Sequence, residues 1–163
     1  MKDRWQTTEN LSERWDKRTI LISKLIDEES NIIEFGAGRL VLKDHLPRGC
    51  KYTPSDITDR GYNTIICDLN NSILPSFDNG HTVACFSGVL EYIEDVPRLI
   101  QHLSNIPTII TSYATLELNI RNPSSQWVNS YTNEEILQIF RSEGYKLSKC
   151  ESWRKQTIYK FTK

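Results

Sequence analysis

The chain has 163 residues, of which 38% are hydrophobic and 25% are charged, and this balance predicts one globular domain with a buried core. Its formal net charge of −1 argues against a nucleic-acid-binding protein that relies on a broad basic face. No apolar run approaches the roughly 20 residues that cross a bilayer, and residues 1–10 lack the apolar segment of a secretory signal. We therefore expect a cytoplasmic protein with no nucleic-acid or membrane partner.

The cysteines are not spaced as metal ligands. Cys50, Cys67, Cys85 and Cys150 form no C-x-x-C pair, and no histidine lies near them at ligand spacing. Cys67 and Cys85 fall within apolar runs, where a reduced cysteine behaves as a small hydrophobic residue. We expect reduced thiols and no metal site.

The first predicted elements are a helix, a strand and a second helix. Residues 11–26 carry apolar side chains near helical spacing, with Asn10 as the candidate N-cap and Glu13 three residues later. A short strand is predicted at Asn31–Phe35, where two glycines interrupt the apolar run. A helix is predicted over residues 40–46, and Pro47 is expected to end it.

Strands and helices continue to alternate to the end of the chain. Asp95, with a proline two residues later, predicts a helix through residue 103, and the capping box of Thr132 and Glu135 predicts another that ends at Gly144. Further strands are predicted at residues 51–55, 64–67, 81–86, 107–113, 145–151 and 157–162. This alternation predicts an α/β fold, with an open, mostly parallel sheet and helices on both faces. Ligands of such sheets bind beyond the carboxyl ends of the strands, where the strand order reverses.

An acid and a glycine turn follow the first strand, in the sequence Glu34-Phe-Gly-Ala-Gly38. The dinucleotide-binding fingerprint G-x-G-x-x-G requires a third glycine where this chain has Val41. An acid at this turn would also repel a pyrophosphate, so a NAD site is disfavoured. A ligand with positive charge would be favoured beside Glu34, although a purely structural turn at a strand end remains an alternative.

The segment resembles the first motif, E/D-x-G-x-G, of the class I S-adenosylmethionine-dependent methyltransferases. That motif usually continues to a further glycine, where this chain has Leu40. The resemblance implies that Glu34, Gly36, Ala37 and Gly38 contact S-adenosylmethionine.

Later predicted strands end in residues that resemble the family's other cofactor contacts. About 20 residues after Glu34, Asp56 matches the acid that binds both ribose hydroxyls. The pair Asp68 and Leu69 matches the acid and apolar residue that contact the adenine.

Two further segments extend the resemblance. The segment Phe86-Ser-Gly-Val-Leu-Glu-Tyr-Ile-Glu-Asp95 is similar to the family's segment after the fourth strand, and it implies cofactor contacts at Ser87 and Gly88. In the first helix, Trp15 and Arg18 resemble a W-x-x-R element that covers the methionyl end of the cofactor.

Candidate catalytic residues lie at the rim of this expected site. A general base would assist a hydroxyl acceptor, and Glu91 is the first choice, with Tyr92, Asp95 and Tyr113 as further candidates. Asp95 is better explained as a helix cap. None of the three histidines is predicted at the cofactor end of the sheet. Some relatives bind a divalent metal through a histidine in this segment, but this chain has Tyr92 at that position, and we expect no metal.

The resemblance covers nearly the whole chain and implies a minimal class I methyltransferase fold, with a single doubly wound sheet of seven strands, the last antiparallel. The connection over residues 58–63 is too short for the usual helix between the second and third strands. We expect one methyltransferase domain over residues 1–163, with an N-terminal helical segment (1–29), a cofactor-binding core (30–115) and an acceptor-side segment (116–163).

Two functional hypotheses follow from the sequence. The first is a methyltransferase that acts on a hydroxyl group of a small molecule or a saccharide, with residues 116–127 as a candidate acceptor wall. The second is a catalytically inactive S-adenosylmethionine-binding module that acts as a regulatory or partner subunit. The sequence does not determine the acceptor or the oligomeric state.

Overall fold

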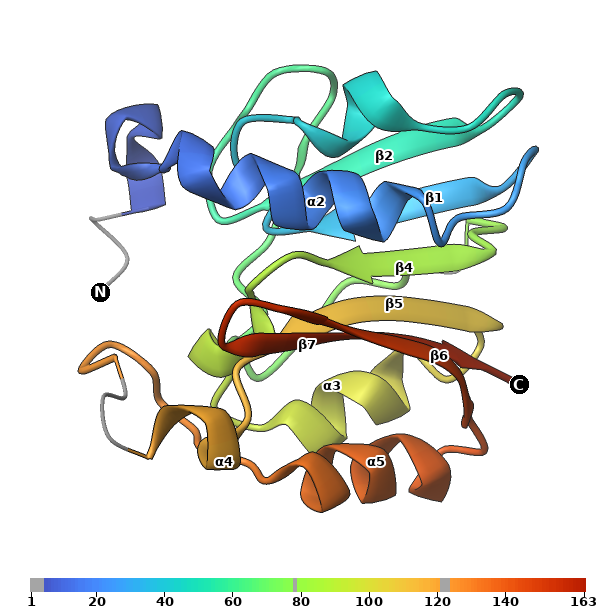
Figure 1. Ribbon diagram of the computed structural model, residues 1–163. Helices are drawn as coiled ribbons and strands as arrows, with labels where there is room; N and C mark the ends of the chain where they lie inside the picture. Colours follow the sequence, from blue (N-terminus) through green and yellow to red (C-terminus); the bar gives the residue numbers. More distant parts are fainter. Residues whose placement is uncertain (1–4, 78, 121–123) are drawn as a thin grey trace.

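A computed structural model describes residues 5–77, 79–120 and 124–163. The strands are β1 (Asn31–Phe35), β2 (Lys51–Asp56), β3 (Ile65–Ile66), β4 (Val83–Phe86), β5 (Thr108–Tyr113), β6 (Lys146–Trp153) and β7 (Gln156–Thr162). They form one seven-stranded sheet in the order β3-β2-β1-β4-β5-β7-β6 (Figure 1). β1 to β5 pair in parallel, and β7 runs antiparallel to both of its neighbours. The predicted mostly parallel sheet is confirmed.

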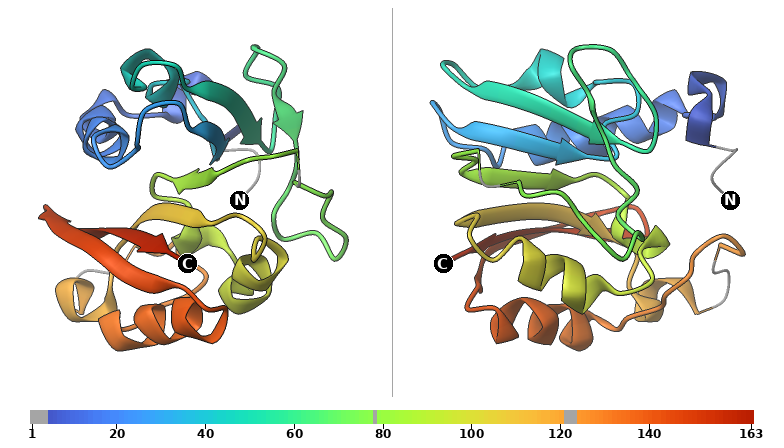
Figure 2. Two further views of the ribbon diagram at one scale, coloured as in Figure 1. Left: turned by 90° about the vertical axis from the view of Figure 1, so that its right-hand side faces the viewer. Right: turned by 180° about the vertical axis from the view of Figure 1, so that it is seen from behind.

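Helices cover both faces of the sheet (Figure 2). The α-helices are α2 (Asp16–Ser23), α3 (Val96–His102), α4 (Leu116–Asn119) and α5 (Asn133–Ser142), and the 3-10 turns are η1 (Thr8–Asn10), η2 (Glu13–Trp15), η3 (Leu42–His45) and η4 (Leu90–Tyr92). α2 packs with η3 on one face, and α3 packs with α5 on the other. The chain therefore has the doubly wound architecture that the alternation predicts.

The central strands supply apolar side chains to both cores. In β1, Ile32 belongs to the core under α2 and Ile33 to the core under α3 and α5. In β4, Cys85 and Phe86 divide in the same way. Because successive side chains of a strand point to opposite faces, a parallel strand that is covered on both sides is a continuous apolar run.

The N-terminal helix begins later than the sequence predicts. α2 starts at Asp16, after the two short turns η1 and η2. The side chain of Ser12 caps η2 by accepting the backbone N–H of Arg14 at 3.3 Å, whereas Asn10 donates to Oγ1 of Thr7. The prediction of Asn10 as a helix N-cap was wrong, because the apolar spacing does not distinguish irregular turns from a regular first helical turn.

The helix predicted over residues 40–46 is only the 3-10 turn η3. Leu40 has φ of +60°, a left-handed conformation that cannot continue a right-handed helix. Residues 57–64 form no helix, as predicted from the short connection. After β5, residues 116–119 form the single turn α4.

The strand order reverses between β1 and β4. The turns η1 and η2 and the start of the segment that begins at residue 124 lie beyond the carboxyl ends of these strands (Figure 1). This edge of the sheet is where a doubly wound sheet binds ligands. Within the described ranges, no helix has the length and apolar character needed to span a bilayer.

Candidate active site beyond the carboxyl ends of the strands

A cavity of about 870 Å³ opens beyond the carboxyl ends of β1, β2 and β4. Its wall includes every residue that the sequence predicts as a cofactor contact. These residues are Trp15, Arg18, Glu34, Gly36, Ala37, Gly38, Asp56, Asp68, Leu69, Ser87 and Gly88. The fold therefore brings together five segments that are separated in the sequence.

Two glycines let the backbone approach its neighbours closely. Gly36 has φ of +67°, and a Cβ atom there would lie 2.5 Å from Cγ2 of Val89. At Gly88, with φ of +68°, a Cβ atom would lie 2.4 Å from Nη1 of Arg18. Only glycine combines this conformation with this lack of space, so both positions keep the turn close to the cavity.

Glu34 lines the cavity but is held from below by the adjacent strand. Its side chain is 2% exposed, and the hydroxyl of Tyr52 donates to Oε2. Burial raises the pKa of Glu34 to about 8, and the hydrogen bond from Tyr52 only partly opposes this shift. The acid that the sequence predicts as a negative charge is therefore mostly neutral at pH 7 in the free protein.

Asp56 ends β2 with both carboxylate oxygens bonded. Oδ2 accepts the backbone N–H of Gly38 at 2.8 Å, and Oδ1 accepts the backbone N–H of Ile57 at 2.7 Å. Oδ1 also accepts from Nη2 of Arg60 at 3.2 Å, in an ion pair whose side chains are 6% and 3% exposed. The glycine turn and the end of β2 are thus joined through one carboxylate.

Arg18 reaches the cavity from α2. Its Nε donates to Oγ of Ser87 at 3.1 Å, and Nη2 donates to the carbonyl oxygen of Ser87 at 2.9 Å. Nη1 donates to Oε1 of Gln156 at 3.0 Å, which connects the helix to β7. Burial lowers the pKa of Arg18, and the nearby Glu91 opposes this shift. The guanidinium is a buried positive charge at one end of the cavity.

Glu91 supplies a carboxyl group from η4. Its side chain is 1% exposed, and Oε1 accepts the backbone N–H of Ala114 at 2.9 Å. In the part of the chain that the structure describes, Oε2 has no hydrogen-bond partner. Burial raises the pKa of Glu91 above its ordinary value. A buried carboxyl oxygen without a partner is costly, so this oxygen is suited to contact a ligand.

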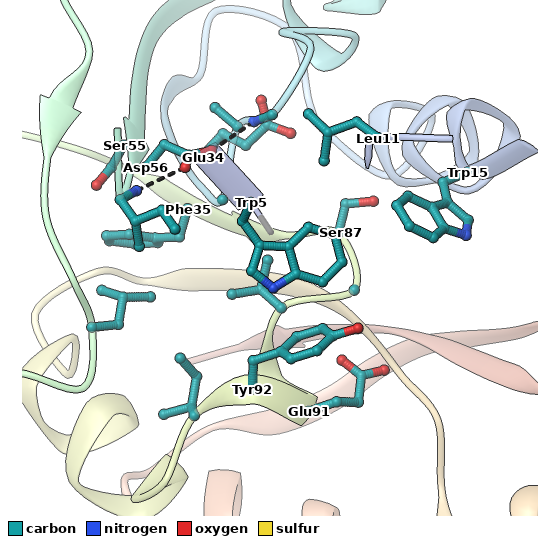
Figure 3. Close-up of a pocket in the computed structure, with 18 of the residues that line it drawn as sticks. Trp5, Leu11, Trp15, Glu34, Phe35, Ser55, Asp56, Ser87, Glu91 and Tyr92 are labelled. Atoms are coloured by element: carbon teal, nitrogen blue, oxygen red, sulfur yellow. Dashed lines mark hydrogen bonds between the residues drawn. The ribbon is translucent and has the colours of Figure 1, made fainter. Parts of the chain in front are cut away.

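Aromatic rings form the wall opposite the glycine turn. The indole of Trp5 points into the cavity, above the ring of Tyr92 (Figure 3). Its ring centroid lies 5.2 Å from that of Tyr92 and 6.1 Å from that of Trp15. Trp127, from the segment after α4, also lines the cavity. The wall is therefore apolar, with Glu91 beside it.

Solved structures with the same fold are methyltransferases. The chain superposes on a SAM-dependent methyltransferase from Aquifex aeolicus with a TM-score of 0.67 and 12% identity, over 95% of each chain. It superposes on 1,6-didemethyltoxoflavin-N1-methyltransferase from Burkholderia thailandensis with a TM-score of 0.68 and 11% identity, over 95% of this chain and 80% of that one. For magnesium protoporphyrin IX methyltransferase from Synechocystis, the TM-score is 0.66 and the identity 15%, over 99% and 93%.

The chain has the class I methyltransferase fold. No protein-family profile matches the sequence, and no curated protein matches it. The similarity is therefore one of fold rather than of sequence.

Two of the predicted catalytic residues, Asp95 and Tyr113, do not line the cavity. Asp95 caps α3 by accepting the backbone N–H of Arg98 at 3.0 Å. Tyr113 is fully buried, where its hydroxyl donates to Oδ1 of Asn129 and accepts the N–H of Tyr131. Glu91 and Tyr92 do line the cavity, so the structure brings together two of the four candidates.

Several residues that line or support the site were missed by sequence reasoning. Trp5, Arg60 and Gln156 line the cavity, and Tyr52 supports Glu34 from the neighbouring strand. None of them belongs to a motif, and their roles depend on contacts between distant parts of the chain. For Tyr52, the only signal in the sequence was a tyrosine in the predicted strand after the one that ends near Glu34.

The acceptor-side segment is only partly described. Of the stretch 116–127 that the sequence suggests as an acceptor wall, residues 124–127 line the cavity together with Val128, residues 116–120 do not, and residues 121–123 lie outside the described residues. Among the described residues, no group of three or more histidine, cysteine, aspartate or glutamate side chains is arranged to hold a metal ion.

Proposed function

We propose that the chain is an S-adenosylmethionine-dependent methyltransferase that acts on a hydroxyl group of a small molecule or a saccharide. The observation that carries this proposal is a cavity at the strand-order reversal. It gathers the glycine turn, the acids Glu34, Asp56 and Asp68, and the buried Arg18. Two of the structures with this fold were solved with bound S-adenosylhomocysteine. One of them also holds 1,6-didemethyltoxoflavin, which is a small-molecule ligand of that protein.

The residues of the cavity fit the cofactor in chemistry and in size. Asp56 and Asp68 offer carboxylate oxygens suited to the ribose hydroxyls and the adenine amino group. Arg18 offers a buried positive charge for the methionyl carboxylate. The volume of about 870 Å³ falls within the range of ligand sites and leaves space for an acceptor beside the cofactor.

When bound, the cofactor supplies an electrophilic methyl group on a sulfonium, with a neutral thioether as the leaving group. The chain's residues then hold the acceptor close to that methyl group, and this positioning lowers the barrier. Glu91, when ionised, accepts the acceptor's hydroxyl proton on Oε2, while the backbone N–H of Ala114 holds Oε1 in place. Tyr92 and the indoles of Trp15 and Trp127 exclude water from the reacting atoms.

A second candidate function is a cofactor-binding module without catalysis. The observation that favours it is the free state of the site, in which Arg60 is bonded to Asp56 and Trp5 occupies part of the cavity. A module that responds to the cofactor would need such a closed state. Binding experiments alone do not separate the two functions, because both require S-adenosylmethionine.

Ligand stabilisation tests the cofactor. We expect S-adenosylhomocysteine to raise the melting temperature by mass action, whereas NADH leaves it unchanged. Stabilisation by NADH alone, or by neither ligand, would contradict the proposal.

Methyl transfer then separates the enzyme from the module. Purified protein is incubated with methyl-labelled S-adenosylmethionine and a panel of phenol, sugar, amine and thiol acceptors, and product methylation is measured. We expect transfer to hydroxyl acceptors. Tight cofactor binding without transfer to any acceptor class would favour the module.

A further inference from the structure

A strap of residues 5–11 crosses the open side of the cavity. Its first residue, Trp5, points its indole into the cavity, and its last, Leu11, packs over the glycine turn (Figure 3). At Leu11, Cδ1 lies 3.3 Å from the place where a Cβ atom on Gly38 would be. The strap therefore covers the positions at which the proposed cofactor would lie.

Arg60 fastens this strap to the end of β2. Its Nη2 donates to the carbonyl oxygen of Trp5, and Nη1 donates to that of Gln6 at 3.3 Å. The same Nη2 donates to Oδ1 of Asp56 at 3.2 Å. The guanidinium is thus a single bridge between the strap and the carboxylate that is the candidate ribose ligand.

The acceptor capacity of Asp56 is nearly exhausted in this arrangement. A carboxylate has about four lone-pair positions, and Gly38, Ile57 and Arg60 already donate to three of them. A ribose diol would bring two more O–H donors, so one existing donor must leave. Gly38 and Ile57 donate through the backbone of the glycine turn and of the strand end. Arg60 donates through a flexible side chain.

The bonding of Arg60 is also incomplete. The guanidinium side chain is 3% exposed, and within the described residues its Nε has no hydrogen-bond partner. An unbonded buried donor makes the fastened state less favourable than a fully bonded one. Arg60 is therefore the donor that can leave Asp56 at the smallest cost.

We propose that Arg60 and the ribose hydroxyls exchange on Asp56, so that cofactor binding unfastens the strap and withdraws Trp5 from the cavity. This inference rests on the proposed cofactor. It makes Arg60 a positioning residue, which acts through Asp56 and Trp5 and does not touch the reacting atoms. A ligand that lacks the ribose diol would leave the strap fastened.

The affinity of Arg60→Gln for S-adenosylhomocysteine tests the exchange. We expect this variant to bind S-adenosylhomocysteine several-fold more tightly than the wild type, because the diol no longer competes with the guanidinium. The matched control is Arg48→Gln, which removes an exposed ion pair with Glu28 and should leave the affinity unchanged. Unchanged or weaker binding by a folded Arg60→Gln variant would overturn the proposal.

A second measurement follows the strap in the wild-type protein, in case Arg60→Gln does not fold. Tryptophan is replaced by 5-fluorotryptophan, and the Trp5 fluorine resonance is assigned by its loss in Trp5→Phe. We expect saturating S-adenosylhomocysteine to move this resonance towards the position of a solvent-exposed indole, whereas 2′-deoxyadenosine analogues that lack the diol do not. Binding of S-adenosylhomocysteine without that movement would overturn the proposed release of the strap. A lack of binding would instead contradict the proposed function.

Discussion

At the scale of single residues, Glu91 has the chemistry of a general base for the proposed reaction. One carboxyl oxygen is fixed by the backbone of Ala114, and the other has no partner among the described residues. We expect Glu91→Gln to lower the rate of methyl transfer by about 10²-fold or more, since an amide cannot take up the acceptor proton. The affinity for S-adenosylhomocysteine should change little. The initial rate and a binding titration are measured on the same preparation, and a rate close to that of the wild type would remove Glu91 from the mechanism.

Glu34 should make the stability of the free protein depend on pH. Its pKa of about 8 in the folded state exceeds the ordinary value of 4.5, so folding favours the protonated acid. The contribution is complete below pH 4.5 and is lost as the pH rises from about 4.5 to about 8. We expect the free energy of unfolding to fall over this range by on the order of a few kcal/mol.

Chemical denaturation at several pH values measures this effect. Glu34→Gln should show a flatter pH dependence, while Glu28→Gln, which alters an exposed acid, should behave like the wild type. Equal slopes for Glu34→Gln and the wild type would show that Glu34 ionises normally in the folded protein.

At the scale of elements, the capping box of α5 is the clearest case of agreement between sequence and structure. The hydroxyl of Thr132 accepts the N–H of Glu135, and the carboxylate of Glu135 accepts the N–H of Thr132. We expect Thr132→Ala to lower the free energy of unfolding by about 1 kcal/mol, with little change in S-adenosylhomocysteine affinity, since α5 does not line the cavity. Denaturant titration of this variant beside Ser130→Ala, at an exposed position outside the cap, measures the effect. A loss equal in both variants would mean that the cap contributes nothing.

The elements that sequence predicts well are those defined by local chemistry. The strands near β1 and β4 follow from apolar runs between turn residues, and α3 and α5 follow from their caps. The start of the N-terminal helix was misplaced because Leu11 and Trp15, before and at the end of η2, are four residues apart, as apolar residues of a helix often are.

The alternation of side chains along a strand decides which of them reach the cavity and which enter a core. Tyr113 ends β5, as the sequence predicts, but its side chain points to the core under α3 and α5, together with Ile109. A shift of one residue would have turned it to the other face. Strand boundaries read from sequence are too imprecise to fix this alternation, which is why Tyr113 was a candidate for the rim.

At the scale of the whole molecule, the motifs predicted residues that line one cavity but not the contacts between Arg60 and the N-terminal segment. Apart from Trp15 and Arg18, the predicted cofactor contacts lie at or just after the carboxyl ends of β1 to β4, and a doubly wound sheet brings these ends together. The bond from Arg60 to Trp5 joins residues that are 55 positions apart and follows no motif. Contacts of this kind depend on tertiary packing, and only the three-dimensional structure reveals them.

The missing helix between β2 and β3 has a practical consequence for the base end of the cavity. Residues 57–64 form no helix. Tyr62 within this segment is 57% exposed, and Ile66 at the end of β3 is 63% exposed. If the adenine lies beside Asp68 as we propose, we expect a linker on the exocyclic nitrogen of the purine to run out into solvent and still leave one N–H to donate to Asp68. An affinity resin built on S-adenosylhomocysteine through that nitrogen should retain the protein and release it when the free compound is added.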